Sequence, residues 1–470
     1  SELPGFYYDP EKNRYFPIKG PIPGSSSKPK TPQAPSKQES GGSCCRKLRN
    51  RTSKLLQARE LDGHRVIASH NCKRNIAEEF RKIHAAKPVV WKFRGADKIG
   101  ISAMEHLRVD VQTRHGQSET DVLLTGNING SLSFSEVGKV GQYFDGGAQW
   151  MADCVKNYDK GKTVEQDELL GPVFRPNRAA LLMPSRISCI RLGPNCSSHA
   201  VNGSPIVGHA LFTTLGSETS GGSVYTIGFV EPLDLGAGTN MGGASVNLET
   251  GITSWFLHCK SDVFAQQIVN SGNVILCGLR NGAIVTVDFR EKRERLSGRL
   301  ITHRIPYTSS DKKVGGSNKE WFKLKGDINP SHTIRMPSSI SSLVSLQDEQ
   351  YFLASSMDGS MRLYDHRLLQ RGAVQYYEGH VNSHTRIQMG VDPTERFVMS
   401  GGEDCKLRLW SIKSGELLFE DKFSDSVLSA VCYKTCRNSF IAEEETQYKH
   451  DSSIGAWLGS HEGLFYMNWL

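Results

Sequence analysis

The side chains of His380, Ser400 and Asp404 are those of a hydrolytic triad, in which a carboxylate orients an imidazole that deprotonates a hydroxyl. All three lie in one segment, YEGHVNSHTRIQMGVDPTERFVMSGGEDCKLRLW (377–410). The sequence has no nucleophile elbow, phosphate loop or metal triad to accompany them. An enzyme is therefore kept as an alternative. A buried, polar central pocket with mutually oriented titratable groups would favour it.

Residue types that bind metals gather at His64, His70, Cys72 and His84. A structural zinc site needs paired ligands at short spacing on both sides, and these four residues do not follow that pattern. We therefore expect no metal and no other cofactor.

The composition bounds the class of protein. The 470 residues are 38% apolar and include 46 glycines, which suits a large all-β fold with many tight turns. Eleven cysteines, an odd number without a CxxC pair, are typical of reduced, buried thiols in a nuclear or cytoplasmic protein. The sequence shows neither a signal peptide nor a long apolar span, so we expect no membrane partner.

A repeated phrase organises the chain: an apolar strand, a turn ending in Asn-Gly or Asp-Gly, and an alternating strand. Clear copies are LLTGNINGSLSFSE (123–136), ILCGLRNGAIVTVDFR (275–290), FLASSMDGSMRLYDHR (352–367) and, with Asp-Cys at its turn, VMSGGEDCKLRLWSIK (398–413). In each copy the turn residue precedes the strand end by six positions, as Asp404 precedes Trp410. Asn-Gly and Asp-Gly favour hairpins because both central residues can take positive φ. The sequence therefore predicts repeated β-hairpins.

The copies, with weaker ones at 221–230 and 457–469, end near residues 135, 227, 287, 364, 410 and 468. The gap between the first two has room for a degenerate seventh blade, so we predict a seven-bladed propeller over 89–470. The sequence ends after a third strand, and VVWKFRG (89–95) is the candidate for the outer strand that closes this blade.

The most complete copy resembles the WD-repeat family, a family of β-propellers. The resemblance implies that His380, Ser400, Asp404 and Trp410 form the hydrogen-bonded tetrad of a blade, in which Asp and His satisfy each other and the bonds end at the indole. The same residues then have structural rather than catalytic roles. The pattern departs from the family elsewhere, because Ala354 and Cys277 replace the Ser or Thr of the tetrad.

Two successive copies end in the same box, Val287-Asp288-Phe289-Arg290 and Tyr364-Asp365-His366-Arg367. The pair resembles the DxR boxes of WD-repeat substrate receptors of cullin-four-type ubiquitin ligases, called DCAF proteins. The resemblance implies that Asp288 and Asp365 fix turns at one rim, and that Arg290 and Arg367 contact the damaged-DNA-binding-protein adaptor. Val287 lacks the family's aromatic side chain, so we expect the second box to contribute more securely than the first.

Three segments precede the propeller. We predict an aromatic motif over 1–18, a flexible linker over 19–43 and a helix–loop–helix over 44–88. The basic first helix carries Leu48, Leu55 and Leu56, and the family resemblance implies that it also grips the adaptor; packing on the propeller's own rim is the alternative. The aromatic motif could be an anchor on the propeller or a binding motif for another subunit.

We therefore expect a non-catalytic substrate receptor that holds an unidentified target protein on the opposite face or at the rim of the central channel. Cullin four would be an indirect partner. We expect no direct nucleic-acid binding, because no recognisable motif accompanies the basic residues near 44–60. Two insertions, 291–333 and 442–453, are candidates for decoration of a face. The alternative function is a WD-repeat scaffold in another nuclear or cytoplasmic complex, with the paired boxes arising by chance.

Overall fold

The computed structural model of the chain describes two compact units, Ser1–Ser43 and Cys44–Leu470. The described residues are 6–9, 14–17, 76–97, 99–113, 116–158, 170–177, 180–183, 185–192, 210–215, 224–227, 234–239, 242–247, 253–259, 261–269, 274–288, 290, 301–307, 320–326, 328–434 and 455–469. In the first unit, β1 (Phe6–Asp9) and β2 (Arg14–Pro17) form an antiparallel pair in which Tyr8 lies opposite Tyr15.

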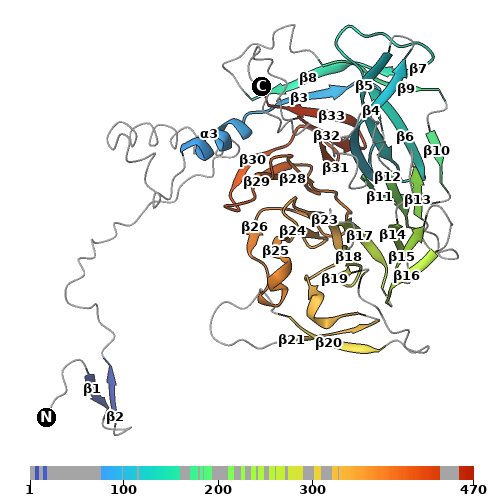
Figure 1. The fold of residues 1–470 in the computed structure, drawn as a ribbon. Coiled ribbons are helices and arrows are strands. Elements are labelled where there is room, and N and C mark those ends of the chain that lie inside the picture. Colours follow the sequence, from blue (N-terminus) through green and yellow to red (C-terminus); the bar gives the residue numbers. More distant parts are fainter. Residues whose placement is uncertain are drawn as a thin grey trace, which may run out of the picture. The chain divides into compact units, whose positions relative to one another are not determined.

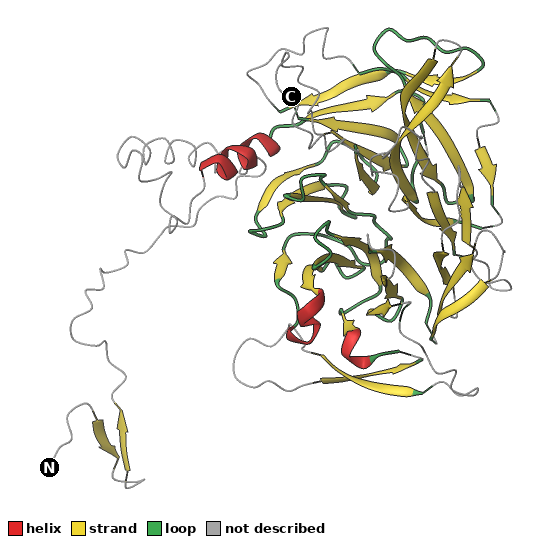
Figure 2. Ribbon diagram, viewed as in Figure 1, coloured by secondary structure: helices red, strands yellow, loops and turns green. Residues whose placement is uncertain are grey.

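The second unit is an all-β propeller (Figures 1 and 2). Five of its sheets have four or more strands and form five blades. The first contains β4 (Ala103–Thr113), β5 (Gly116–Gly126), β6 (Ser131–Val137), β9 (Val173–Pro176) and β7 (Gly147–Trp150), with β10 (Ala180–Leu182) paired to β6. The second contains β17 (Val263–Ile268), β18 (Val274–Leu279), β19 (Ala283–Asp288) and β22 (Thr333–Arg335).

The remaining three blades follow in the C-terminal part of the chain. The third contains β23 (Ile340–Ser345), β24 (Tyr351–Ser356), β25 (Met361–Asp365) and β26 (Gln375–Tyr377). The fourth contains β27 (Gly390–Val391), β28 (Phe397–Gly401), β29 (Leu407–Ser411) and β30 (Leu417–Asp421). The fifth contains β31 (Leu428–Tyr433), β32 (Gly455–Ser460), β33 (Gly463–Asn468), β3 (Val89–Phe93) and β8 (Ala152–Asn157).

Two sheets have only three strands. They are β11 (Ile187–Leu192), β12 (Ala210–Thr214) and β13 (Val224–Ile227), followed by β14 (Asp234–Thr239), β15 (Gly242–Asn247) and β16 (Thr253–His258). A sheet that the repeats did not indicate lies over 234–258. Between 135 and 187 the described strands form no separate blade, because β7, β9 and β10 join the β4–β6 sheet and β8 joins β3. The sequence hides β14–β16 because its strands are rich in small residues and its turn lacks an Asn-Gly or Asp-Gly pair.

The predicted closure of the last blade is confirmed. Strand β3 pairs antiparallel with β33, with Val89 opposite Asn468 and Trp91 opposite Tyr466. The cores on both faces of this pairing are apolar, and the rings of Phe93 and Trp457 stack at 5.5 Å. Strand pairing between residues so distant in sequence leaves the sheet without an open edge at this point.

Among the described residues, one helix precedes the closing strand. Helix α3 (Ile76–Ala85) lies in the second of the two stretches for which a helix was expected, and its chain turns into β3 at Pro88. The indole of Trp469 donates a hydrogen bond to the Ala85 carbonyl at 2.8 Å, and Lys82 pairs with Glu416 at 3.2 Å. These contacts fix the end of the helix against the propeller.

The first long insertion contains a two-stranded ribbon, β20 (Thr302–Tyr307) and β21 (Glu320–Lys325), and a short 3-10 helix, η3 (Pro330–His332). Ile305 and Leu324 are buried in the same apolar cluster as Val285 of β19. The ribbon is therefore packed on the propeller core. The second insertion, 442–453, lies outside the described residues.

Three hairpin turns share a geometry that differs from the expected one. Only the glycine has positive φ, at 81° in Gly130, 84° in Gly282 and 85° in Gly359. The residue before each glycine uses its side chain to accept a hydrogen bond from the backbone N–H two positions on, as Asp358 accepts from Ser360 at 3.1 Å. These are three-residue loops with a left-handed glycine, so the prediction of two central residues with positive φ is wrong.

The same glycines bind the segment that leaves their blade. The Gly130 and Gly282 carbonyls accept hydrogen bonds from the backbone N–H groups of Met183 and Met336. A Cβ on Gly359 would lie 2.7 Å from the carbonyl oxygen of His380. The turn glycine is thus required both by its φ and by this close approach.

Among the described residues, no helix has the length and apolarity needed to cross a bilayer. All six described cysteines are free thiols, and Cys259, Cys277 and Cys432 are buried. Cys277 lies in β18, Cys432 lies in β31 and Cys259 directly follows β16, in agreement with the expected use of cysteine as a small core residue.

We predict that Gly359→Ala lowers the free energy of unfolding by about 1–3 kcal/mol, since it adds left-handed strain and a clash with the His380 carbonyl. Gly141→Ala is the matched control, because Gly141 has a φ of 77° and open space at its Cβ position. It should cost about 1 kcal/mol. Chemical denaturation measures both, and equal losses would contradict a specific contact at Gly359.

Candidate docking site

The first box begins where β19 ends. The Asp288 carboxylate accepts three hydrogen bonds from the Arg290 side chain, two of them from Nε at 3.0 and 3.2 Å and one from Nη2 at 2.7 Å. It also accepts the Arg290 backbone N–H at 2.9 Å. The Arg290 side chain nevertheless remains 68% exposed. The carboxylate therefore holds a solvent-facing guanidinium in one orientation.

The second box repeats this geometry at the end of β25. Asp365 accepts the Arg367 backbone N–H at 2.9 Å, Nε at 3.0 Å and Nη2 at 2.8 Å. Asp365 is buried, Arg367 is 58% exposed, and the guanidinium lies 5.9 Å from the Tyr351 ring centroid. The first box has Val287 where the second has Tyr364. Both side chains are buried, and the hydrogen bonds between aspartate and arginine are the same in the two boxes.

In both boxes the arginine lowers the pKa of the carboxyl group below its ordinary value, because its hydrogen bonds favour the charged form. The nearby charge of His332 lowers the pKa of Asp288 further. Both aspartates are therefore ionised at neutral pH, and each grips its arginine. The Nη1 donors of both guanidinium groups stay outside these pairs.

The two boxes lie on a continuous surface. Arg367 belongs to η4 (His366–Arg371), whose Gln370 side chain donates hydrogen bonds to the carbonyls of Ser331 at 2.9 Å and Pro330 at 3.3 Å in η3. Helix η3 also places His332 beside Asp288. It therefore links the first box to the second along one rim, where Leu368 adds an exposed apolar side chain.

The other residues expected to bind the adaptor, Leu48, Leu55 and Leu56, lie outside the described residues, as do His64, His70 and Cys72. Within the part of the chain that the structure describes, no group of three metal-ligating side chains comes together. His84 lies in the last turn of α3.

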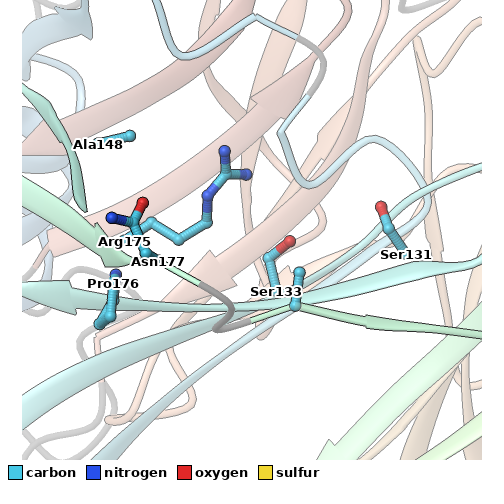
Figure 3. A pocket seen from close by; sticks show the side chains of 7 residues that line it. Ser131, Ser133, Ala148, Arg175, Pro176 and Asn177 are labelled. Atoms are coloured by element: carbon cyan, nitrogen blue, oxygen red, sulfur yellow. The ribbon is translucent and has the colours of Figure 1, made fainter. Parts of the chain in front are cut away.

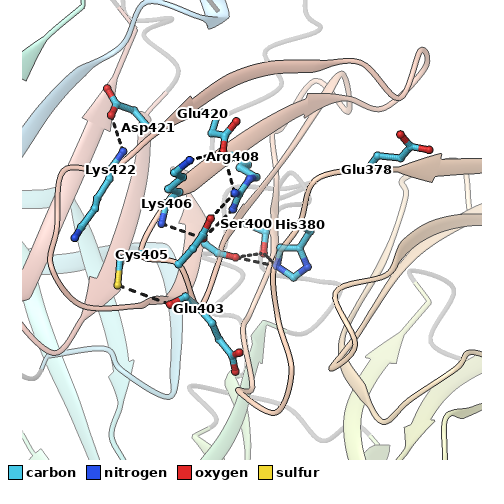
Figure 4. Close-up of polar contacts among 12 residues, drawn as sticks. Glu378, His380, Ser400, Glu403, Cys405, Lys406, Arg408, Glu420, Asp421 and Lys422 are labelled. Atoms are coloured by element: carbon cyan, nitrogen blue, oxygen red, sulfur yellow. Dashed lines mark hydrogen bonds and ion pairs between the residues drawn. The ribbon is translucent and has the colours of Figure 1, made fainter. Parts of the chain in front are cut away.

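Of the expected tetrad, Ser400, Asp404 and Trp410 lie in the fourth blade and His380 lies in the segment that leads into it, and two of the expected bonds differ. Figure 4 shows His380 beside Ser400. His380 Nε2 and Ser400 Oγ lie 3.2 Å apart, as expected. The buried Trp410 indole instead donates to the Glu378 carbonyl at 2.8 Å. His380 also contacts the Gly401 carbonyl at 2.9 Å, so its ring is satisfied without Asp404.

Asp404 binds Arg408 rather than His380. Arg408 Nη1 lies 3.0 Å from Asp404, and Nη2 lies 2.9 Å from Glu420, with only 4% of the arginine side chain exposed. Partial burial would raise the pKa of Asp404, but the hydrogen bonds from Arg408 lower it below its ordinary value. A buried guanidinium needs a carboxylate partner more than a neutral imidazole does, which explains the rearrangement.

A cavity of about 920 Å³ opens at the other end of the same strands. Arg280 and Met357, which precede β19 and β25, line it, whereas the boxes follow these strands. The cavity and the boxes therefore lie on opposite faces of the propeller, about one strand length apart. Arg186 and Arg386 also line the cavity, and sequence reasoning did not identify them. A sequence pattern that the two arginines share could have identified them, because each follows Ser or Thr and precedes a buried isoleucine.

Three catalytic residue types meet at the mouth of this cavity, but they do not form a relay. Ser383 Oγ lies 2.7 Å from His384 Nδ1, and Glu403 lies 3.3 Å from the same nitrogen. A catalytic imidazole uses one ring nitrogen for each partner. Hydrogen bonds from Ser383 and Thr385 lower the pKa of Glu403 to about 2, against the effect of its burial. The carboxylate therefore serves to fix the 383–385 loop.

A smaller cavity, of about 260 Å³, lies on the first blade and is shown in Figure 3. Ser131, Ser133 and Arg175 are among its lining residues, and the Arg175 guanidinium lies 5.2 Å from the centroid of the Trp150 ring. Its arginine thus already has an aromatic partner.

Comparison with known proteins points to one group. The model of the DDB1- and CUL4-associated factor 4 β-propeller domain matches residues 322–424, which include the second box. The human DDB1- and CUL4-associated factor 4 is 25% identical over 441 residues, which cover 89% of this chain and 78% of the relative. The human DDB1- and CUL4-associated factor 4-like protein 2 is 29% identical over 158 residues, 34% of this chain and 32% of the relative. The bovine factor 4 is 27% identical over 158 residues, 34% of this chain and 25% of the relative.

We predict that Asp404 is energetically coupled to Arg408 and not to His380. A double-mutant cycle of Asp404→Ala with Arg408→Ala should give a coupling of about 1–3 kcal/mol, whereas the cycle with His380→Ala should give less than about 0.5 kcal/mol. Chemical denaturation at pH 7 measures both cycles, and a larger coupling to His380 would restore the tetrad as first expected.

The pH dependence of this coupling follows from the depressed pKa of Asp404. A carboxyl whose pKa is lowered in the folded state stabilises that state above the unfolded pKa, here about 3.9. The coupling should therefore be complete at pH 6 and decline as the pH falls below about 4.

Proposed function

Since the chain is a WD-repeat protein similar to DDB1- and CUL4-associated factor 4, we propose that it is a substrate receptor of a cullin-RING E3 ubiquitin ligase of the cullin-four type. In this role it is a non-catalytic subunit. It docks on the damaged-DNA-binding-protein adaptor, DDB1, and binds a target protein elsewhere on the propeller. Cullin four is then reached through the adaptor. Ubiquitination is promoted because the complex raises the effective concentration of the target near the ligase's catalytic arm.

The single observation that supports this proposal is the matched geometry of the two boxes. Hydrogen bonds from Arg290 to Asp288 and from Arg367 to Asp365 agree within about 0.1 Å at the backbone N–H, at the shorter Nε contact and at Nη2. Two arginines that are oriented before binding lose little conformational entropy when a partner supplies acceptors. This arrangement suits a docking surface better than it suits stabilisation of the blades, since both guanidinium groups are exposed.

Two further parts of the proposal concern the architecture. We propose seven blades, because the three-stranded sheets β11–β13 and β14–β16 lie in the chain between the β4 and β17 blades and contact them through β11 and β14. We also propose that Leu48, Leu55 and Leu56 of the expected basic helix contribute to adaptor binding. Their spacing places them on one side of a helix.

A WD-repeat scaffold of another complex is the second reading. The same rim would then bind a different protein through Arg290 and Arg367. Binding to the adaptor separates the two readings, because only the receptor needs it.

We predict that the double variant Arg290→Glu, Arg367→Glu loses adaptor binding by at least about 100-fold, since each substitution reverses an exposed charge and places it beside an aspartate. The measurement is the Kd for purified damaged-DNA-binding-protein adaptor by surface plasmon resonance. The Tm should change by less than about 2 °C, because both side chains are exposed.

Arg94→Glu is the matched control. Arg94 is an exposed arginine that pairs with Asp153 and directly follows β3. The end of β3 lies beside the beginning of β33, which places Arg94 on the cavity face. This variant should bind the adaptor like the wild type. Failure of the wild type to bind the adaptor would overturn the receptor proposal and leave the scaffold reading.

A further inference from the structure

The cavity opposite the boxes contains an arginine that has no counter-ion among the described residues. Arg386 immediately precedes the inner strand segment that contains Gln388, and its Nη1 is buried without a hydrogen-bond partner. None of the described carboxylates forms an ion pair with it. The pKa of Arg386 is lowered to about 10, mainly by burial, with the charges of Arg186 and Arg191 also lowering it and Cys189 raising it. A buried guanidinium is rarely left without an acceptor unless a ligand supplies one.

The neighbouring charges leave an excess of positive charge in this region. Arg191 is paired with Glu105 at 2.9 Å, and it also donates to the Leu343 carbonyl at 3.0 Å. Among the described residues, the acceptor of the Arg186 side chain is the neutral Ser102 hydroxyl, at 3.2 Å. The single carboxylate of Glu105 is therefore used by one of three adjacent arginines, and Arg186 and Arg386 remain for an incoming anion.

The acidic groups at the cavity mouth do not compensate this excess, because each has a partner of its own. Asp425 pairs with Lys422 at 3.0 Å, and Asp262 pairs with Arg280 at 3.1 Å. Glu403 accepts backbone hydrogen bonds from Thr385 at 2.9 Å and from His384 at 3.1 Å. His461 also lines the mouth. The field inside the cavity is thus positive.

Apolar side chains surround the two arginines. They come from strand β17 and from turns and segments next to the other strands, and they are Ile101, Ile128, Leu215, Phe264, Met357 and Val427. A volume of about 920 Å³ is within the range that buries a small ligand or several side chains of a peptide. The anion that fits this cavity is therefore one with apolar groups on either side of it. An acidic residue between hydrophobic residues of a protein has this character.

We propose that this cavity binds a carboxylate side chain of an acidic target peptide, with Arg386 as the primary contact and Arg186 beside it. The inference rests on the proposed receptor function, for which it names the class of target. Both guanidinium groups would donate to the carboxylate, and the apolar lining would bury the flanking residues. A nucleic acid would instead need a row of exposed cations along its phosphates, whereas the two arginines here lie inside an apolar cavity.

The test uses the full chain and two fluorescein-labelled peptides, a glutamate hexapeptide and its glutamine counterpart. Fluorescence anisotropy should show that the wild type prefers the glutamate peptide at low salt. Arg386→Gln should weaken binding of that peptide about 10- to 100-fold, as expected for loss of a charge-assisted hydrogen bond. Its Tm should not fall, because the substitution removes no ion pair among the described residues.

Arg371→Gln is the matched control, since Arg371 is exposed at the end of η4, on the face of the boxes. It should bind the glutamate peptide like the wild type. Equal affinity of the wild type for both peptides, or unchanged affinity in Arg386→Gln, would overturn the inference. A competition experiment with an unlabelled thymidine oligonucleotide tests the alternative ligand. If the oligonucleotide displaces the labelled glutamate peptide at a lower concentration than the unlabelled glutamate peptide does, the inference is overturned in favour of nucleic acid.

Measuring adaptor binding on the same variants separates this inference from the receptor proposal. Arg386→Gln should bind the adaptor normally, and the Arg290→Glu, Arg367→Glu variant should bind the glutamate peptide normally. Adaptor binding without any peptide preference would reject only the acidic target. Peptide binding by a wild type that does not bind the adaptor would reject the receptor proposal and leave the cavity as an acidic-peptide site.

Discussion

The antiparallel pairing of β3 with β33 is the constraint on which the rest of the structure depends. It joins a strand that follows α3 to the final strands of the described chain, and it is flanked by apolar cores on both faces. A sheet closed in this way has no free edge there, so the inner strands of different blades can meet around a central channel. Gln388 shows the consequence, because its side chain donates to the Met104 carbonyl at 2.8 Å although the two residues belong to different blades.

The antiparallel order within each blade then separates the two candidate sites. A strand such as β19 has Arg280 just before its first residue and Asp288 as its last residue, so one end faces the cavity and the other begins a box. The adaptor docking and the target binding that we propose would therefore take place on opposite faces, without steric conflict. The distance between them is fixed by strand length and not by a flexible linker.

The two sites use arginine in opposite ways. At the boxes, each guanidinium is exposed and already paired with an aspartate, so its orientation is set before a partner arrives. In the cavity, Arg386 Nη1 is buried and the arginine pairs with no described carboxylate, so under the proposal a ligand supplies its counter-charge. The first arrangement favours rapid, geometrically specific docking, and the second favours selection of a ligand by charge.

The sequence by itself determined the repeated hairpins, the strand that closes the ring and the two boxes, because each depends on residues close together in the chain or on a phrase that recurs at fixed spacing. The partners of Asp404 and Trp410, the position of the β14–β16 sheet and the excess charge around Arg386 were decided only by the tertiary structure. Arg186 and Arg386 are 200 positions apart; each stands between Ser or Thr and a buried isoleucine, but this shared pattern does not by itself place them in one cavity. Packing of the blades brings them together, and burial then makes an ordinary arginine costly to leave unpaired.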